Sequence, residues 1–245
     1  MPRHFPLLLA LLIAAPAFAQ DVITPGHSDI DTSFIESGEA NYSISIKQGP
    51  MEQTIGTVTT TLVIDEETGQ IEAIRAYEMM GQKLADTTVA AWPSLAAISH
   101  VSNNPQRSLR FTVADGMITG ARNAPGHEPE TFEMSVDGPI FDAAWMSTLV
   151  PALPLEDGYE VTVTAFEDDE AGIGDYALSV SGPVSLQLPS GQKYDVWEVA
   201  AVNPSGETVR YFYDVNNRAL LRIAMNPQPG LEVFIDAEMG GGDGK

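Results

Sequence analysis

The chain of 245 residues contains no cysteine, which excludes disulfide bonds, thiolate metal sites and a cysteine nucleophile. Basic residues are also few, because 12 Lys and Arg stand against 34 Asp and Glu and give a formal net charge of −22. So few cations cannot neutralise a polyanion, and we expect no nucleic-acid partner. Hydrophobic residues make up 44% of the chain, a share typical of a folded globular protein and too high for a disordered one.

Sequence motifs for common chemistries are also missing. The chain has no G-x-S-x-G nucleophile elbow, no H-E-x-x-H metal motif, no glycine-rich phosphate loop and no dinucleotide fingerprint. Once the first residues are set aside, His27, His100 and His127 are each alone in their neighbourhood, and a lone His in a loop is usually an exposed residue rather than a ligand. We therefore predict that the protein is not an enzyme and uses no cofactor.

The first twenty residues have the layout of a secretory signal peptide. A weakly basic start is followed by an almost wholly apolar run over residues 5–16, and Ala17 and Ala19 place small side chains where a signal peptidase cuts. The apolar run is shorter than the roughly 20 residues that span a bilayer, so we favour cleavage after Ala19 over a retained anchor. We expect a periplasmic or secreted bacterial protein with no integral membrane segment after cleavage.

Most of the remaining sequence alternates between apolar and polar residues with the period of two that is typical of β-strands. In residues 40–47 the apolar side chains occupy every second position, and residues 109–113 and 132–136 repeat the pattern. The acidic loop 65–69 ends in Gly and joins two such runs, which predicts a hairpin. The other runs lie at 54–64, 71–77, 117–119, 159–163, 176–180, 184–188, 194–202, 208–214, 219–225 and 231–235.

This spacing of about a dozen strands predicts an all-β protein. We expect a curved antiparallel sheet, in the form of a half-barrel, a barrel or a sandwich. No shift in composition divides the chain, so we predict one domain over residues 38–238. The Gly- and Pro-containing segment 20–37 predicts a flexible lead-in, and the Gly-rich residues 239–245 predict a flexible tail.

One segment departs from the strand pattern. Asp142 is a good N-cap residue, and apolar side chains then recur at helical spacing as far as Val150. Pro151 and Pro154 follow, and a helix cannot continue through them. We predict a single short helix that docks on the sheet, and a further helical turn at 92–98.

The C-terminal strands have apolar residues on both faces. Aromatic residues fill positions 211–213, and positions 196–197 and 220–221 also place large apolar side chains on opposite faces. Apolar side chains on both faces of a strand indicate that something covers each face. One cover is the usual core; the other is the short helix, a second sheet layer or a ligand in an apolar cavity.

An acidic run at residues 167–170, followed by Asp175, is the one candidate that the sequence offers for a cation. Calcium takes six to eight oxygen ligands from a loop of defined shape, and the EF-hand spacing is not present. A charged loop between two strands explains the run without a ligand. We therefore predict no metal site and keep Asp168, Asp169 and Asp175 only as a candidate loop.

Four segments, at 139–142, 149–159, 188–197 and 211–222, match a known pattern of the form fD…LPL-x-x-Gy, paG…aW-x-V and yWyd-x-x-tr-x-Lvr. On these residues the chain resembles the exported bacterial β-proteins of the domain-of-unknown-function 3108 type. Phe212 stands where the pattern has Trp, and Asn217 where it tends to have Thr. The resemblance implies a curved antiparallel sheet and no particular reaction. The expected architecture is also similar to envelope lipid carriers with a half-barrel wrapped on a helix, an analogy of fold alone.

These observations favour a protein that binds an apolar small molecule or a cell-envelope component in the concavity of its sheet. The alternatives are an envelope protein–protein interaction module that uses an edge strand or loop, and a carboxylate-dependent hydrolase. We expect a monomer. The predicted lining residues are large and mostly aromatic, with tyrosine hydroxyls as orienting groups, and they are Tyr77, Met79, Phe111, Trp145, Leu149, Trp197, Tyr211 and Tyr213.

Overall fold

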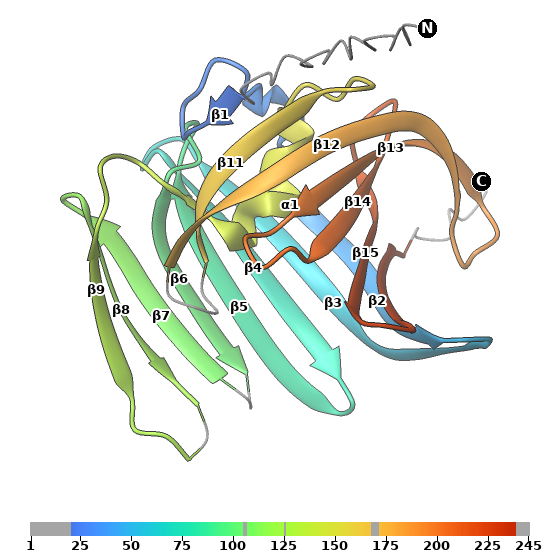
Figure 1. The fold of residues 1–245 in the computed structure, drawn as a ribbon, viewed down its shortest axis with the longest axis horizontal. Helices are drawn as coiled ribbons and strands as arrows, with labels where there is room; N and C mark the ends of the chain where they lie inside the picture. The colour runs from blue at the N-terminus through green and yellow to red at the C-terminus, as the bar shows by residue number, and fades with distance from the viewer. Residues whose placement is uncertain (1–20, 105–106, 125, 168–171, 239–245) are drawn as a thin grey trace, which may run out of the picture.

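The computed structural model describes residues 21–104, 107–124, 126–167 and 172–238. These ranges contain sixteen strands, one short α-helix and three 3-10 helices (Figure 1). The strands of the first half are β1 (Asp21–Ile23), β2 (Gly38–Gln48), β3 (Met51–Asp65), β4 (Gln70–Met79), β5 (Gln82–Ala91), β6 (Ala97–Asn104), β7 (Arg107–Ala114) and β8 (Met117–Asn123). Those of the second half are β9 (Glu130–Ser135), β10 (Phe141–Asp142), β11 (Glu160–Glu167), β12 (Gly172–Gln187), β13 (Lys193–Val202), β14 (Thr208–Asp214), β15 (Leu220–Gln228) and β16 (Leu231–Ala237). The helices are η1 (Thr32–Phe34), η2 (Ala143–Trp145), α1 (Met146–Leu149) and η3 (Val150–Ala152).

All sixteen strands belong to a single sheet, in the order β1-β11-β12-β13-β14-β15-β16-β2-β3-β4-β5-β6-β7-β8-β9, with β10 also paired to β11. Neighbours in this order are antiparallel, except that β1 and β10 run parallel to β11. Strand β16 pairs with β2 over seven residue pairs, which joins the two halves of the chain edge to edge. The prediction of a curved antiparallel sheet is confirmed.

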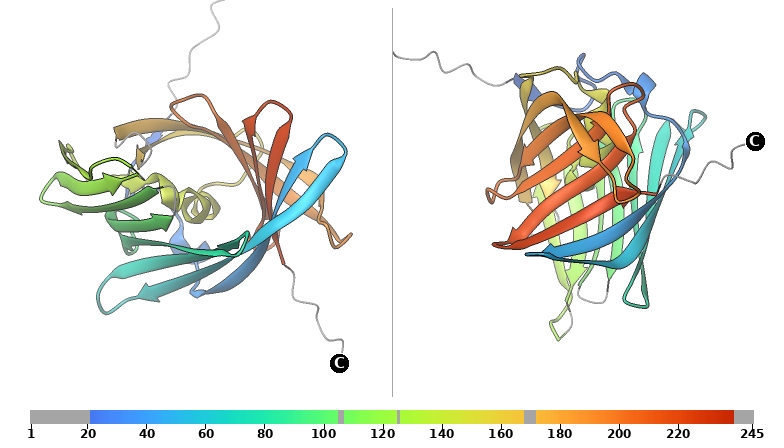
Figure 2. Two further views of the ribbon diagram at one scale, coloured as in Figure 1. Left: turned by 90° about the horizontal axis from the view of Figure 1, so that it is seen from below. Right: turned by 90° about the vertical axis from the view of Figure 1, so that its right-hand side faces the viewer.

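The sheet curls around the three consecutive short helices η2, α1 and η3, residues 143–152, which we call the plug (Figure 2). Trp145, Leu149 and Val150 of the plug are at most 1% exposed, because they pack into the main apolar core on the inner face of the sheet. Just before the plug, the carbonyl of Ile140 accepts a hydrogen bond from the Ala97 amide of β6, while β10 pairs with β11. The chain that leads into the plug therefore bridges two distant parts of the sheet.

The plug begins and ends for the reasons that the sequence indicates. The Asp142 side chain caps it by accepting a hydrogen bond from the Ala144 amide at 3.0 Å. Pro151 occupies an early position of η3, where it needs no hydrogen-bond donor of its own, and the helical backbone ends at Leu153. The prediction of one short helix docked on the sheet is confirmed, although α1 itself spans only four residues.

The C-terminal strands are buried on both faces. Tyr211 and Tyr213 point into the main core beside the plug, whereas Phe212 packs on the opposite face with Leu186 and Val196. The pairing of β12 with β13 shifts register between Ser181 and Val184. After this shift, side chains such as Leu186 point to the outer face of the sheet and form the second cluster. The bent end of β12 therefore supplies the second cover as part of the same sheet.

Two further expectations need correction. Residues 21–37 are not a loose lead-in, since β1 pairs with β11 and both Ile23 and Ile35 are buried in the main core. The segment 92–98 is not a helical turn but the connection from β5 to β6, and its last two residues already belong to β6.

The predicted signal peptide (residues 1–19) and tail (residues 239–245) lie outside the described residues. No helix among the described residues has the length and apolarity needed to cross a membrane.

Burial of the plug predicts the effect of shortening one of its side chains. We expect Leu149→Ala, at a side chain only 1% exposed, to lower the free energy of unfolding by about 2–5 kcal/mol in urea denaturation. The matched control is Ile173→Ala on β12, where the side chain is 43% exposed and a change within about 0.5 kcal/mol is expected. Equal effects at the two positions would contradict the burial of the plug.

Candidate functional site

A cavity of about 1020 Å³ separates the plug from part of the inner face of the sheet. Strands β2, β3 and β4 form one wall, β14, β15 and β16 form another, and the plug and η1 close it from within the curl. The lining residues used below come from all of these elements and are Phe34, Tyr42, Val58, Thr60, Leu62, Arg75, Tyr77, Ser147, Pro151, Tyr213, Arg218, Leu220, Ile223 and Ile235. This cavity is the candidate functional site.

Strand register sets the order of side chains along one wall. Tyr42 of β2 pairs with Val58 of β3, which in turn pairs with Tyr77 of β4, so these three form a row across the sheet. Thr60 pairs with Arg75, two residues further along each strand. Side chains two residues apart on a strand share a face, and the wall therefore carries one apolar and aromatic row beside a polar row with a single cation.

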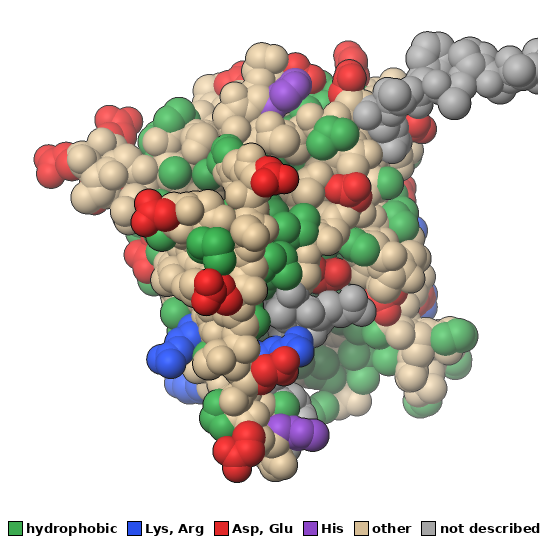
Figure 3. Space-filling model, turned by 60° about the vertical axis from the view of Figure 1, so that its left-hand side comes forward, with side chains coloured by type: hydrophobic (Ala, Val, Ile, Leu, Met, Phe, Trp, Pro, Cys, Tyr) green, Lys and Arg blue, Asp and Glu red, His purple; other side chains and the backbone are tan. Residues whose placement is uncertain are grey.

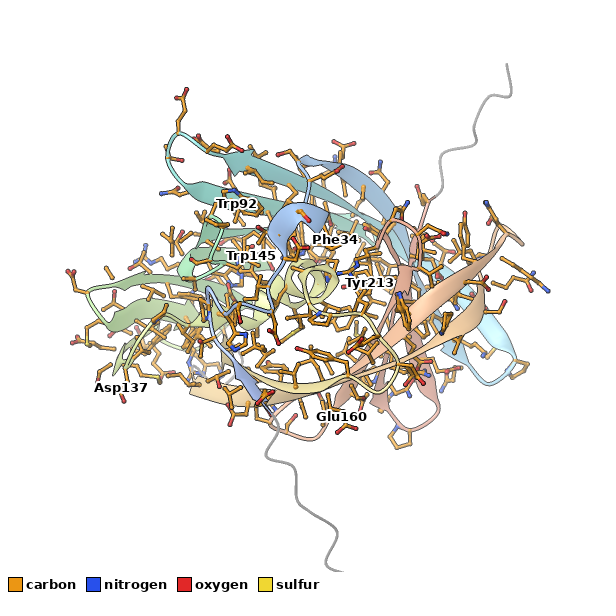
Figure 4. All side chains as sticks on the ribbon, turned by 90° about the horizontal axis from the view of Figure 1, so that it is seen from above. Phe34, Trp92, Asp137, Trp145, Glu160 and Tyr213 are labelled. Carbon is orange, nitrogen blue, oxygen red and sulfur yellow. The ribbon has the colours of Figure 1, made fainter. Side chains whose placement is uncertain are left out.

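Side chains from the sheet hold the plug through its backbone carbonyls. Nη2 of Arg75 donates to the Ala144 carbonyl at 2.7 Å and to Oγ of Ser147 at 3.3 Å. The Tyr213 hydroxyl donates to the carbonyl of Ser147 at 2.9 Å. Figure 4 places Tyr213 beside α1, on the side away from Trp145. These donors reach carbonyls of η2 and α1, and so connect the first half of the plug to β4 and β14.

Arg218 provides the same support at the far end of the plug. Its Nη1 donates to the carbonyls of Pro151 at 2.8 Å and Leu153 at 3.0 Å. Its guanidinium also lies 3.6 Å from the ring centroid of Phe34 on η1, an arrangement that favours a cation on an aromatic face. Burial lowers the pKa of Arg218, while Asp31 acts in the opposite direction. Arg218 thus fixes both η1 and η3 to the β14–β15 hairpin.

The tyrosines in and beside the cavity, on the inner face of the sheet, are neutral at physiological pH. Burial raises the pKa of Tyr42 and of Tyr77, and the positive charge of Arg75 opposes this rise at both residues. Burial also raises the pKa of Tyr211 to about 12 and that of Tyr213 well above its usual value. All four phenols therefore keep their protons and can donate hydrogen bonds.

A second buried polar group lies on the neighbouring strands. His100 of β6 is 1% exposed, and its imidazole lies between two carboxylates, with Nε2 at 2.8 Å from Asp86 and Nδ1 at 2.9 Å from Asp142. Burial opposes the charged imidazolium, but the carboxylates of Asp142 and Asp86 favour it and raise the pKa of His100 to about 10. Asp142 also caps the plug, so this group ties the plug to β5 and β6.

The arrangement around His100 does not suit acid–base or hydrolytic chemistry. Both ring nitrogens face carboxylates, and with a pKa near 10 the imidazole already carries both protons at neutral pH. A general base needs a free nitrogen within reach of the substrate. Asp142 is only 2% exposed, so a substrate cannot reach it and it does not provide a carboxylate for hydrolysis. We interpret the group as a structural ion cluster.

The predicted lining residues are dispersed. Tyr77 and Tyr213 border the cavity, and Met79 packs in the apolar cluster beside it. Tyr211, Trp197 and the plug residues Trp145 and Leu149 pack in or against the main core instead. Phe111 does not border the cavity. It lies on β7, beyond β6, and the centroid of its ring is 4.6 Å from that of Phe166 in a separate apolar cluster.

Sequence reasoning missed Arg75, Arg218 and His100. Arg75 had a detectable signal, since it occupies an inward position of the strand run 71–77, where Ile71, Ala73 and Tyr77 are the other inward residues. A cation in an apolar register is a candidate for a buried functional group. His100 lies in a strand that was not predicted, and Arg218 reaches the plug from a turn, so neither had such a signal.

The acidic candidate loop remains without support as a metal site. Asp168 and Asp169 lie outside the described residues, and Asp175 accepts a hydrogen bond from Oγ1 of Thr164 at 2.7 Å. Within the described ranges, no group of three His, Asp or Glu side chains is placed to hold a metal ion. On the face seen in Figure 3, acidic side chains are scattered rather than gathered into one patch.

Comparisons with known proteins agree with this architecture. The family described as "Protein of unknown function (DUF3108)" matches residues 29–236, and none of the curated proteins matches the chain. The chain is similar in structure to a β-barrel-like protein of the domain of unknown function DUF1849 from Brucella abortus, with a TM-score of 0.54 and 11% identity over 82% of this chain and 94% of that one. A DUF1329 family protein from Desulfovibrio piger matches with a TM-score of 0.23 and 10% identity over 84% and 86%. The similarity to the DUF1849 protein is one of fold alone.

The His100 cluster predicts a pH dependence of stability. Because the pKa is about 10 in the folded protein and about 6.5 in an unfolded chain, the folded state holds one more proton between these values. Stability is therefore fully present below pH 6.5 and falls as pH rises toward 10, by at most about 1.4 kcal/mol per pH unit. Urea denaturation from pH 6 to 9 measures this slope.

His100→Gln should flatten the slope, because the group that titrates is removed. It should also lower stability at pH 6.5 by about 3–5 kcal/mol, since Asp142 then remains buried without its cation. His127→Gln is the matched control, because His127 is exposed and should leave the slope unchanged. A slope that is the same in all three proteins would contradict the assignment.

Proposed function

The chain belongs to the DUF3108 family of proteins of unknown function, and we propose that it binds an apolar ligand in the cavity between the plug and the sheet. The single observation that carries this proposal is the cavity itself. The plug fills one part of the curl with closely packed side chains, yet it leaves about 1020 Å³ unfilled against β2, β3 and β4. Exposed residues such as Glu36 and Glu39 border this space, so it is a pocket that opens to solvent and that a ligand can enter.

The size and lining of the cavity support a ligand. Ligand sites usually measure roughly 300–1,000 Å³ and are lined mainly by apolar and aromatic side chains with a few polar groups. Val58, Leu220 and Ile235 supply apolar surface here, whereas Tyr77 and Arg75 supply orienting polar groups. The signal-peptide pattern at the start of the sequence supports binding in the periplasm or outside the cell.

The alternative function, a protein–protein interaction module, depends on a different feature. Strand β9 ends the sheet, and such an edge can pair with a strand of another protein. However, β9 spans only six residues, and Glu130 and Glu133 are exposed on it. Short, charged edges are how natural sheets avoid pairing. The edge is therefore poorly suited to a partner strand, and we favour the cavity.

A neutral fluorescent probe tests the proposal. We expect N-phenyl-1-naphthylamine to bind the purified chain, and Thr60→Trp to weaken binding by at least about tenfold, because the indole would fill space beside Arg75. Native mass spectrometry of protein purified without detergent should also show a bound lipophilic molecule.

The matched control for this experiment is Thr57→Trp. Thr57 lies on the same strand, is exposed and does not line the cavity, so the substitution should leave probe affinity within about twofold. Absence of probe binding to the unsubstituted protein, or equal loss in both variants, would refute ligand binding in this cavity.

A further inference from the structure

We infer that the ligand is an amphipathic anion, with one carboxylate or phosphate group received by Arg75 and an apolar chain lying between β2–β4 and β14–β16. This inference rests on the proposed function and deepens it by assigning a head group. It follows from the hydrogen-bonding capacity, the charge and the surroundings of Arg75.

Arg75 has donors that the described residues do not use. Its side chain makes two hydrogen bonds, to the Ala144 carbonyl and the Ser147 hydroxyl, and both come from Nη2. Nε and Nη1 donate to no group among the described residues, and neither of them is sealed away from solvent without a partner. Arg75 lines the cavity, so its unused donors are available to a group placed there. Nε and Nη1 lie on different edges of the guanidinium, so each can donate a separate charge-assisted hydrogen bond to an oxygen of a carboxylate or a phosphate.

The positive charge of Arg75 also lacks an anionic partner. No carboxylate of the described residues forms an ion pair with it within 4 Å, although the residue is only 9% exposed. Asp86 lies opposite Arg75 on β5, but its carboxylate is paired with His100 at 2.8 Å. Asp142 is paired with the other side of the same imidazole. The imidazolium and its two carboxylates together carry one net negative charge, which balances that of Arg75 across β4 and β5, but no anion contacts the guanidinium directly.

Neutral hydroxyls beside Arg75 would complete the receiving site. Tyr42 and Tyr77 both line the cavity, and burial keeps their phenols protonated. Arg75 acts electrostatically on both, which places the two phenols within reach of its field. A phenol and a guanidinium can donate to any acceptor oxygen, and the positive charge of Arg75 favours an anionic acceptor over a neutral one.

The remaining lining suits an apolar chain, and the acidic residues do not prevent anion binding. Val58, Ile223 and Ile235 continue the cavity away from Arg75 as apolar surface. The acids Glu36, Glu39 and Glu238 also line it and are exposed, whereas Asp214, which is partly exposed, accepts hydrogen bonds from the amides of Asn216 and Asn217 in its own turn. Water and salt screen exposed charges, whereas a buried guanidinium is screened far less. Arg75 therefore dominates the interaction with a head group placed inside.

Ligands with one chain length and different head groups test this inference. We would measure displacement of N-phenyl-1-naphthylamine from the full chain by hexadecanoate, hexadecyl phosphate, hexadecanol and hexadecyltrimethylammonium, each below its critical micelle concentration. At least one of the two anions should bind about tenfold or more tightly than hexadecanol, and the cation should bind least. The stronger of the two anions identifies the head group, and acetate and inorganic phosphate, which lack the chain, should not displace the probe.

Variants at Arg75 show whether this residue causes the preference. Arg75→Gln keeps an amide donor for the plug carbonyl and removes the charge, so it should abolish the preference for the anion over hexadecanol. Arg75→Lys keeps the charge and should retain part of the preference. If Arg75→Gln does not fold, the comparison of the four ligands on the unsubstituted protein still decides the question.

The outcomes separate the inference from the function on which it rests. Equal binding of hexadecanoate, hexadecyl phosphate and hexadecanol would overturn the anionic head group and leave apolar binding intact. A preference for the anion that survives in Arg75→Gln would overturn the role of Arg75. Failure of all four ligands, together with failure of the probe itself, would overturn both the inference and the proposed function.

Discussion

The structure depends on hydrogen bonds from sheet side chains to the backbone carbonyls of the plug. A helical segment of ten residues inside a curled sheet has few intrahelical partners for its last carbonyls, and leaving them unpaired away from water is costly. Arg218 and the backbone amide of Asp31 supply donors at the end of the plug, whereas Arg75 and Tyr213 bond carbonyls of Ala144 and Ser147 nearer its start. These bonds fix where the plug sits, and the position of the plug sets the boundary of the cavity.

The same requirement explains why cations lie inside a protein with a net charge of −22. A guanidinium presents several N–H donors on one rigid plane, so it can serve a carbonyl with one nitrogen and keep the others for a second partner. At Arg218 the other partner is the ring of Phe34. At Arg75 no described residue takes that place, which distinguishes this side chain from the rest of the interior. The ion cluster at His100 is satisfied on both sides and therefore acts as a brace.

Much of the fold followed from residue patterns, because strand alternation and helix capping are local properties. The alternation in residues 40–47, the cap at Asp142 and the two-faced run 211–213 each predict what the structure shows. The site was harder to predict, since a cavity depends on which strands become neighbours. Nothing in the sequence indicates that β16 pairs with β2, and that pairing brings Ile235 near the wall that contains Arg75. Phe111 was chosen for its aromatic character alone, and the order of the sheet placed it elsewhere.

The most direct test of a ligand site beside Arg75 is a crystal structure of the chain with 16-bromohexadecanoate. The bromine marks the end of the chain by its anomalous scattering, and the density at the other end locates the carboxylate. We predict a bromine peak inside the cavity, near the wall of β14–β16, with the carboxylate within hydrogen-bond distance of Arg75. A cavity that holds only ordered water at saturating ligand would contradict the account.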